Sequence, residues 1–477
     1  MKRALRRAVL PATVCATALA AMAPAAHAGF NVQKCNGSSI VGSGSSFQKI
    51  IQQNIWTQND LATGGFAGSN ANLSFCLPGS PFNDNNNTIT YNSTGSGAGK
   101  RTFDSDGVAP YRAGNGPDRF VAFDDAPTAT EIANMDAGDP AISTDNANIR
   151  VIPVGTGAIT ISVHFPDGCK WRSDYDWKVN NSDFTTRFKL PNTKWEQVFD
   201  GSISTWGQLL AISPTIPGIS AIAGSGLTNA QCVATPIKRA VRSDVSGTTF
   251  NFKQWLETVD PSQSPSWDEN TPGGLANLDW PNDSGATAVV RGNGNGGVAA
   301  QVNATNGSVG YVDLATARAN GFDMTPAATL LTADRKFWVP VQNGSAAYLD
   351  PQTTEFGFKS TSTDRGAACN KATVVNIPSN PDPTLDTDWS HTTAGNSPAG
   401  YGICLVSYVG AWDDDKDAYG FGTGGSEQNL ARTVKDYVTY MTGGTGQSLL
   451  PRFDYAKLPT SLSTIAINGA AAINWNK

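Results

Sequence analysis

The sequence has little charge, no basic stripe and no succession of long apolar runs, and each shortage excludes a class of protein. Charged residues make up 16% of the 477 residues, which is below the ~25% of an average globular chain. The 34 Lys and Arg residues are scattered, which argues against a nucleic-acid partner. The composition also excludes collagen, a coiled coil and a protein with many membrane spans.

The N-terminus has the order of a secretory signal. A basic start is followed by an apolar run over residues 8–22 and by the small-residue site Ala26-His27-Ala28. This order predicts a signal peptide over residues 1–28, cleaved after Ala28, and hence a periplasmic, extracellular or cell-surface protein. A membrane anchor would need ~20 unbroken apolar residues. Cys15 has no convincing lipobox before it, which disfavours a lipid anchor.

Cysteine and histidine are too widely spaced to suggest a metal site. Beyond the leader only His164 and His391 remain, and both fit structural or surface positions better than zinc ligation. Six of the seven cysteines follow the leader, and an even number in an exported chain favours disulfides. Pairing of nearest neighbours predicts Cys35–Cys76, Cys169–Cys232 and Cys369–Cys404, with other connectivities left open.

Short β-rich runs alternate with amphipathic helices, which predicts an α/β fold with a largely parallel sheet. The predicted helices cover residues 47–56, 250–259 and 430–441. The predicted strands cover residues 88–91, 119–123, 151–154, 158–165 and 240–242. Residues 413–417 are rich in aspartate but lack the glycine and distal glutamate of a calcium loop. We therefore expect an exposed acidic turn there.

Four loops of small and polar residues have the composition of one anion site. Residues 42–47 and 92–100 place Gly and Ser before a helix, where unpaired N–H groups and the helix dipole favour an anion. Residues 120–127 end a strand in two carboxylates, and residues 239–249 bring Arg, hydroxyls and glycine to a helix start. Each loop alone also fits an ordinary capped helix or a solvated acidic turn.

The carboxylate is the informative member of such a site. Asp124 and Asp125 follow a strand, so at most one of them faces a given ligand. Phosphate still carries a proton near neutral pH, and an Asp can accept it, whereas sulfate has no proton and meets only repulsion. One Asp among donors therefore favours phosphate. A nucleotide is disfavoured, because Arg101 follows Gly99-Lys100 where a P-loop has Ser or Thr.

In this order the motifs resemble those of the periplasmic phosphate-binding proteins of high-affinity phosphate ABC transporters, which belong to the type II solute-binding protein family. The resemblance covers most of residues 40–325 and returns at 436–459, whereas residues 326–430 match poorly. Its segments are GSGSSF (42–47), YNSTGSGAG (91–99), VAFDDAP (121–127), KWEQVFDGSISTW (194–206), VRSDVSGTTF (241–250), GSVGYV (307–312) and DYAKLP (454–459).

The resemblance implies an α/β protein of two lobes joined by crossover strands, with the ligand in the cleft between them. Lobe I would comprise residues 29–153 and 312–477, with the poorly matched insertion 326–430, and lobe II residues 154–311. It implies a monomer that captures inorganic phosphate and docks on ABC permease subunits. No cofactor, metal or catalytic residue is expected.

The resemblance also implies a ligand set. Ser46 would offer its hydroxyl, Phe47 its backbone N–H, and Ser96 would cap its helix towards the anion. Asp125 would accept the phosphate proton and Arg242 would pair with the oxyanion. The cage would be completed by Ser246, Gly247 and Thr248.

Three departures from the family pattern concern this site. Ser46 stands where the family often has Thr, which keeps the hydroxyl, and Phe123-Asp124 stands where a small residue and Ser would be more familiar. Asp124 adds a negative charge beside Asp125, and Gly97-Ala98 replaces a more usual Ser-Gly. A binding protein for another oxyanion, an adhesin and a phosphatase on the same scaffold are the alternatives. A phosphatase would need an activated nucleophile or metal pair, and Ser96 has no identifiable His partner.

Overall fold

One long strand, β4, runs through the centre of the protein. It spans Ile149–His164, and every one of its residues is buried in the computed structural model. The structure describes residues 39–57, 89–106, 118–137, 147–172, 189–322, 336–352, 365–378, 389–419 and 425–475. The predicted signal peptide and the predicted Cys35–Cys76 pair lie outside the described residues.

The elements alternate along the chain in the manner of an α/β protein. The strands are β1 Ile40–Gly44, β2 Ile89–Asn92, β3 Asp118–Phe123, β4, β5 Cys169–Trp171, β6 Ile219–Ala221, β7 Lys238–Arg242, β8 Val290–Gly292, β9 Ser308–Asp313, β10 Lys336–Val339, β11 Val341–Gln342, β12 Tyr348–Leu349, β13 Cys404–Trp412 and β14 Tyr455–Ala456. The helices are α1 Lys49–Ile51, α2 Ser96–Thr102, α3 Ala129–Asp136, α4 Asn192–Phe199, α5 Trp206–Leu209, α6 Asn229–Ala234, α7 Gly247–Val259, α8 Gly294–Ala304, α9 Leu314–Ala319, α10 Asp415–Ala418, α11 Gly425–Thr442, α12 Gly444–Leu449 and α13 Thr460–Ala472, with a π-helical turn at Gln52–Trp56 and 3₁₀ turns at Gly285–Thr287, Ala367–Lys371 and Leu450–Phe453.

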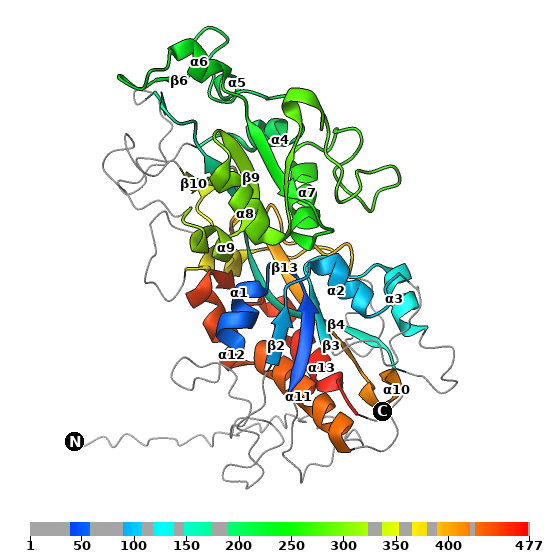
Figure 1. Cartoon of the computed structure of the whole chain (residues 1–477). Helices are drawn as coiled ribbons and strands as arrows, with labels where there is room; N and C mark the ends of the chain where they lie inside the picture. The colour runs from blue at the N-terminus through cyan, green and yellow to red at the C-terminus, as the bar shows by residue number, and fades with distance from the viewer. Residues whose placement is uncertain are drawn as a thin grey trace, which may run out of the picture.

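The main sheet joins two lobes through β4, in the order β2-β1-β3-β13-β4-β9-β7-β8. The first half of β4 pairs with β13, and the second half pairs with β9. We call the half with β1, β2, β3 and the helices α1, α2 and α11 lobe I, and the half with β7, β8, β9 and the helices α7 and α8 lobe II (Figure 1). The chain thus crosses between the lobes on β4 and again on β13.

The pairing of the strands is parallel at the two flanks and antiparallel at the centre. β1 pairs in parallel with β2 and β3, and β7 with β8 and β9. β13 is antiparallel to both β3 and β4, and β9 is antiparallel to β4. The predicted largely parallel sheet is therefore correct for the flanks and wrong for the centre, because β4 leaves lobe I while β13 returns to it.

The predicted break between strands 151–154 and 158–165 is wrong, since β4 continues through it. Gly155 and Gly157 lie between the two predicted ranges, and both belong to the strand. A Cβ atom on Gly157 would come within 2.4 Å of the Phe47 ring. Glycine is therefore needed here for the close packing of another segment, rather than for a turn.

The acidic segment 413–417 also differs from the prediction of an exposed turn, because Asp413, Asp414 and Asp415 are buried. Asp413 accepts a hydrogen bond from the Asn148 N–H at 2.8 Å and pairs with Arg150. Asp414 caps helix α10 by accepting N–H bonds from its first turn. Asp413 thus serves as an ion-pair partner and Asp414 as a helix cap, which compensates for the burial of these two carboxylates.

The helix and disulfide predictions fare better. α7 and α11 contain the predicted helices 250–259 and 430–441, whereas residues 47–56 form a single α-helical turn followed by a π-helical one. The predicted bonds Cys169–Cys232 and Cys369–Cys404 are confirmed.

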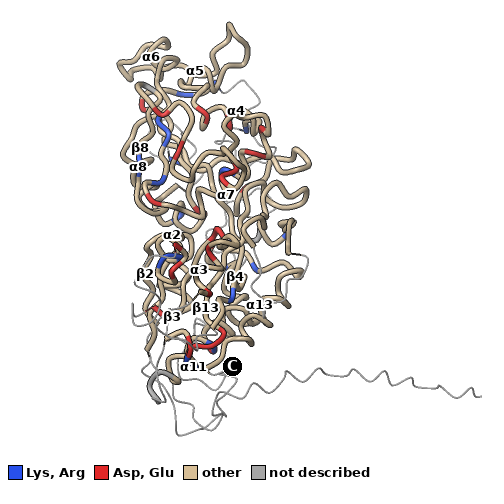
Figure 2. The backbone as a smooth tube through the Cα atoms, turned by 90° about the vertical axis from the view of Figure 1, so that its right-hand side faces the viewer, with Lys and Arg blue, Asp and Glu red and all other residues tan. Residues whose placement is uncertain are grey.

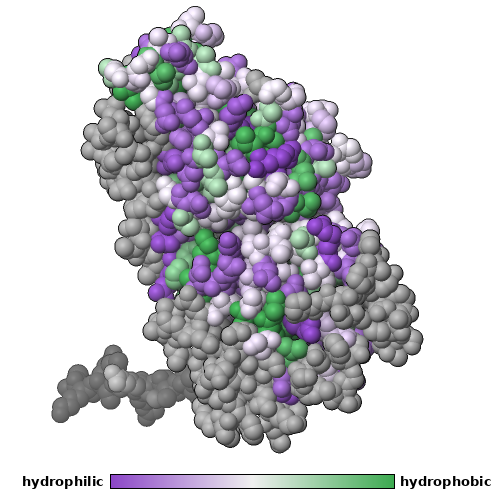
Figure 3. All heavy atoms as spheres, in the orientation of Figure 1, coloured by the Kyte–Doolittle hydropathy of each residue, from purple (hydrophilic) through white to green (hydrophobic). Residues whose placement is uncertain are grey.

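Within the described residues no helix combines the length and apolarity needed to cross a membrane. On the face seen in Figure 3 the apolar residues form small, separate groups.

Candidate anion-binding site

The loop after β1 brings the first two predicted ligands to the junction of the lobes. Gly44 has φ 124°, and the N–H of the next residue, Ser45, donates to the Ala122 carbonyl at 2.7 Å. The chain therefore turns sharply against β3. Ser45 Oγ accepts the N–H of Phe47 at 3.0 Å. Ser46 Oγ accepts the N–H of Asn295, from lobe II, at 3.2 Å. The Phe47 N–H would therefore have to share its bond in order to contact an anion.

Helix α2 begins at the predicted ligand Ser96. Gly95 precedes it with φ 97°, and a Cβ atom on Gly95 would lie 2.6 Å from Asp244 Oδ2 of lobe II. Glycine is required here for both reasons. Ser96 Oγ accepts the N–H of Asp124 at 3.2 Å, which ties the start of α2 to the end of β3.

Asp125, the predicted proton acceptor, is buried with its two oxygens in different situations. Oδ2 accepts a bond from Lys100 Nζ at 3.0 Å. Oδ1 is buried and has no hydrogen-bond partner among the described residues. Gly247 lies against it, since a Cβ atom there would come within 2.6 Å of Oδ1. Burial raises the pKa of Asp125, and Lys100 opposes that rise. Oδ1 is therefore the acceptor that this residue can offer to a ligand.

Asp124 faces away into lobe I, as the alternation of a strand requires. Its side chain accepts bonds from Ser45 Oγ at 2.6 Å and Ser407 Oγ at 2.5 Å. Burial raises the pKa of Asp124 to about 7, while the two serine hydroxyls lower it and the charge of Asp125 raises it further. The second carboxylate is thus held by hydroxyl donors and is partly protonated near neutral pH.

In lobe II, Arg242 ends strand β7 in the position predicted. Its Nε donates to Asp244 Oδ1 at 2.8 Å and its Nη2 pairs with Oδ2, so the guanidinium is held by a bidentate contact. The side chain is buried, and Nη1 has no hydrogen-bond partner within the described part of the chain. Asp244 thus orients the fork and leaves one edge available for an oxyanion.

Helix α7 begins at the other three predicted ligands. Ser246 is its N-cap and accepts the N–H of Thr249 at 3.2 Å. Gly247 is the first helical residue, and it packs against Asp125 of lobe I. Thr248 Oγ1 accepts a bond from Asn295 Nδ2 at 3.2 Å. This arrangement directs the N-terminus of a thirteen-residue helix at the junction, where its dipole favours negative charge.

The structure brings all eight predicted residues to one place, with the lobes in contact around them. The Gly97 N–H lies 3.5 Å from the Val245 carbonyl, and Asn251 Nδ2 donates to the Asp124 carbonyl at 2.7 Å. The predicted ligands from lobe I are Ser46, Phe47, Ser96 and Asp125, and those from lobe II are Arg242, Ser246, Gly247 and Thr248. Their roles as ligands stay predictions.

Two further residues were missed. Lys100 lies one turn after Ser96, and the i, i+4 spacing on α2 would have placed both on one face. Asn295 lies near the start of α8, in the run Gly292–Gly297. That run repeats the signal of the four loops, a strand followed by glycines and a helix, and would have been found by the same reasoning. Both residues contact predicted ligands.

The charges of the region are largely paired with one another. Figure 2 shows acidic and basic residues side by side around α2. Four carboxylates accompany two cations: Asp124, Asp125, Glu131 and Asp244 with Lys100 and Arg242. An anion would therefore be held by N–H groups, hydroxyls and the free edge of Arg242 more than by net charge. No cluster suited to a metal ion occurs among the described residues.

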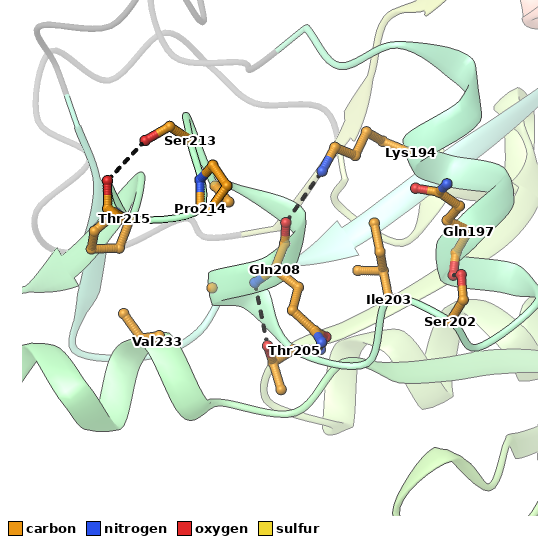
Figure 4. A pocket seen from close by; sticks show the side chains of 13 residues that line it. Lys194, Gln197, Ser202, Ile203, Thr205, Gln208, Ser213, Pro214, Thr215 and Val233 are labelled. Atoms are coloured by element: carbon orange, nitrogen blue, oxygen red, sulfur yellow. Dashed lines mark hydrogen bonds between the residues drawn. The ribbon is translucent and has the colours of Figure 1, made fainter.

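A separate open groove of about 540 Å³ lies at the far end of lobe II (Figure 4). It is lined by α4, α5, α6 and the turn at 213–217. Its one charged side chain is Lys194, whose Nζ donates to the Gln208 carbonyl at 3.3 Å. The groove thus has none of the carboxylate or guanidinium groups found at the junction, and it is not the predicted anion site.

Comparison with known proteins gives the family. The model of the PBP superfamily domain matches residues 40–362. The chain belongs to the PBP superfamily. Among solved structures, a high-affinity periplasmic phosphate-binding protein (PfluDING) bound with phosphate is similar, with a TM-score of 0.54 at 16% identity over 92% of this chain and 99% of that chain. This likeness shows the two-lobed type II binding-protein fold, as predicted.

Curated members of the superfamily resemble part of the chain. Over 178 residues it is 29% identical to the phosphate-binding protein PstS of Xylella fastidiosa, which covers 37% of this chain and 39% of that protein. Over 223 residues it is 30% identical to alkaline phosphatase L of Pseudomonas aeruginosa, covering 40% and 53%. The chain thus matches about two fifths of the first relative's length and about half of the second's.

Proposed function

We propose that this protein captures inorganic phosphate and delivers it to an ABC permease. The proposal draws on the PBP superfamily fold, on relatives named as phosphate-binding proteins, and on the chemistry at the junction of the lobes. There, the start of α7 lies against a single unpartnered carboxylate oxygen of Asp125, and the same junction holds the fork of Arg242 and the start of α8.

The observation that carries the proposal is the state of Asp125. Its Oδ1 is buried against the first residue of α7 and has no partner among the described residues. A buried acceptor without a donor is unfavourable. A protonated oxyanion supplies that donor, whereas a fully deprotonated one adds a second negative charge without a shared proton. Phosphate therefore fits and sulfate does not.

Calorimetric titration of phosphate-stripped protein tests this directly. We expect one-to-one binding of phosphate at neutral pH and much weaker binding of sulfate, whose affinity is measured by competition with phosphate. Asp125→Asn should weaken phosphate binding by about 2 kcal/mol, the scale of a charge-assisted hydrogen bond, and should not weaken sulfate binding, because the amide is neutral and can donate. Exposed Asp106, changed to Asn, is the matched control. Equal losses for both anions in Asp125→Asn would argue against proton acceptance, and a silent wild type would remove phosphate as the ligand.

Capture and delivery imply further properties that we include in the proposal. The protein is exported to the periplasm or the cell surface, with cleavage after Ala28, and acts as a monomer. Residues 29–153 and 312–477 form one lobe and residues 154–311 the other, and phosphate stabilises their closed arrangement. The closed form is the one that docks on the permease subunits. Scattering from the protein with and without phosphate measures the closure.

The similarity to alkaline phosphatase L makes phosphatase activity a second function to test. Ser96 is the serine nearest to the start of α2, and its Oγ accepts the Asp124 N–H, which activates no nucleophile. We therefore expect no turnover of an aryl phosphate ester, even with divalent metals added. Turnover that is lost in Ser96→Ala would replace the binding proposal with a phosphatase.

A further inference from the structure

Lys100 is a buried cation at the edge of the candidate site. It lies on α2, one turn after Ser96, and only 6% of its surface is exposed. Its Nζ contacts Asp125 Oδ2 and Glu131 Oε1, each at 3.0 Å. Burial alone would lower the pKa of Lys100, but the two carboxylates outweigh burial and raise it above its ordinary value. Lys100 thus stays charged beside the predicted proton acceptor.

The charges that face Asp125 come from four segments. Lys100 on α2 favours its ionised form, whereas Glu131 on α3 and the neighbouring Asp124 oppose ionisation, and Glu269 of lobe II interacts with it repulsively. Among the described residues, Lys100 is the one cation in direct contact with the carboxylate. Its contact also fixes Oδ2 and leaves Oδ1 towards Gly247.

We propose that Lys100 determines the anion selectivity of the site by keeping Asp125 ionised, so that Asp125 accepts the proton of a protonated oxyanion. This inference rests on the proposed function. Lys100 acts through Asp125 and is a positioning residue that does not itself need to touch the anion.

The inference has a specific consequence for a protein without Lys100. Asp125 would then be buried beside other carboxylates with no cation, and desolvation would drive it to take a proton from solvent near neutral pH. A protonated Asp125 donates where the ionised form accepts. It would suit sulfate, which needs donors on every oxygen, and would no longer take up the phosphate proton.

The first test compares Lys100→Met with Arg101→Met. Arg101 is the next residue of α2 and is exposed, so the control loses the same charge without touching Asp125. We expect Lys100→Met to lower the ratio of phosphate to sulfate affinity at least tenfold at pH 7, through weaker phosphate and stronger sulfate binding. Arg101→Met should keep the ratio of the wild type, and Lys100→Arg should restore most of it. An unchanged ratio in a folded Lys100→Met protein overturns the inference.

A second variant should favour the ionised form of Asp125, the opposite of the effect of Lys100→Met, and it keeps the buried lysine. Glu131→Gln leaves Lys100 to Asp125 alone, and the Gln side-chain oxygen can still accept the Thr128 N–H that Glu131 accepts at 2.8 Å. Because Glu131 opposes the ionisation of Asp125, its removal should lower the pH below which phosphate binding is lost. A limit that stays in place contradicts the inference even where Lys100→Met fails to fold.

Infrared difference spectra of ligand-free protein separate this inference from the proposed function. At pH 7, Lys100→Met should show one protonated-carboxyl band in addition to those that Asp124 and Asp313 already give in wild type, and this additional band should disappear in the double variant with Asp125→Asn. If the wild type binds no phosphate and the band appears, the proposed function fails and the control of Asp125 by Lys100 stands. If the wild type binds phosphate and no band appears, the inference alone fails.

Discussion

The two halves of the candidate site are built on different principles. Lobe II contributes an arginine whose charge is already balanced by Asp244, together with the starts of helices α7 and α8. Lobe I contributes buried carboxylates and a buried lysine, packed around the end of β3. Under the proposed function, the donors of lobe II would hold almost any oxyanion, since they do not distinguish between anions. The charges of lobe I would then decide which oxyanion is accepted.

The largest effect should follow from removing the donor fork of lobe II. Arg242→Ala should lose about 2 kcal/mol or more of binding free energy, the scale of a buried charge-assisted pair. Because the fork does not distinguish oxyanions, any anion that binds should be weakened alike, unlike in variants of lobe I. Lys194→Ala, which removes a positive charge from the distant groove of the same lobe, is the control. Affinity unchanged in Arg242→Ala would refute the site.

A smaller effect should follow from disturbing the contact between the halves. A Cβ atom on Gly247 would lie 2.5 Å from the Asp125 backbone nitrogen, so Gly247→Ala overpacks the junction. We expect a penalty of about 1–3 kcal/mol on phosphate binding. Gly296→Ala is matched to it, since no atom lies within 4 Å of a Cβ atom there. Calorimetry that finds both variants equal to wild type would mean that the lobes do not meet at Asp125 in the bound form.

The last effect is on stability rather than on binding, and it concerns Asp124 of lobe I. The folded pKa of Asp124 is about 7, above its unfolded value of 3.8. Between these values the folded protein holds a proton that the unfolded chain has lost, so stability falls as pH rises, by up to about 1.4 kcal/mol per pH unit.

Urea unfolding at pH 5 and pH 8 in phosphate-free buffer measures this slope. Asp124→Asn should make it less steep, because the amide has no proton to lose, whereas Asp106→Asn should leave it unchanged. A slope as steep in Asp124→Asn as in wild type would assign the dependence to other carboxyls, such as buried Asp313, whose pKa burial also raises to about 7.

The sequence predicts what depends on neighbours in the chain. The start of α7 follows from Ser246 and Gly247, and the fork of Arg242 from Asp244 two residues later, because caps and turns are local. The pairing of Lys100 with Asp125 joins two residues 25 positions apart in the sequence, and neither segment contains a local motif that predicts the contact. The burial of Asp413 depends on Arg150, 263 residues away. Such contacts emerge only when the sheet is assembled.

The continuity of β4 was missed for the same reason. Gly155 and Gly157 signal a turn when read locally, and only the position of the Phe47 ring explains why a strand needs them. The family resemblance supplied the crossover that local reading could not. It did not supply Lys100 or Asn295, because the implied ligand set stops at the residues that touch the anion.

Strand β4, which both lobes share, has a consequence for how the protein unfolds. β4 donates and accepts ladder hydrogen bonds in both halves of the sheet, with β13 along one part of its length and β9 along the other. Melting either half strips partners from a strand that the other half also needs. The two lobes are therefore expected to unfold as a single cooperative unit, although the proposed function has them move as separate bodies.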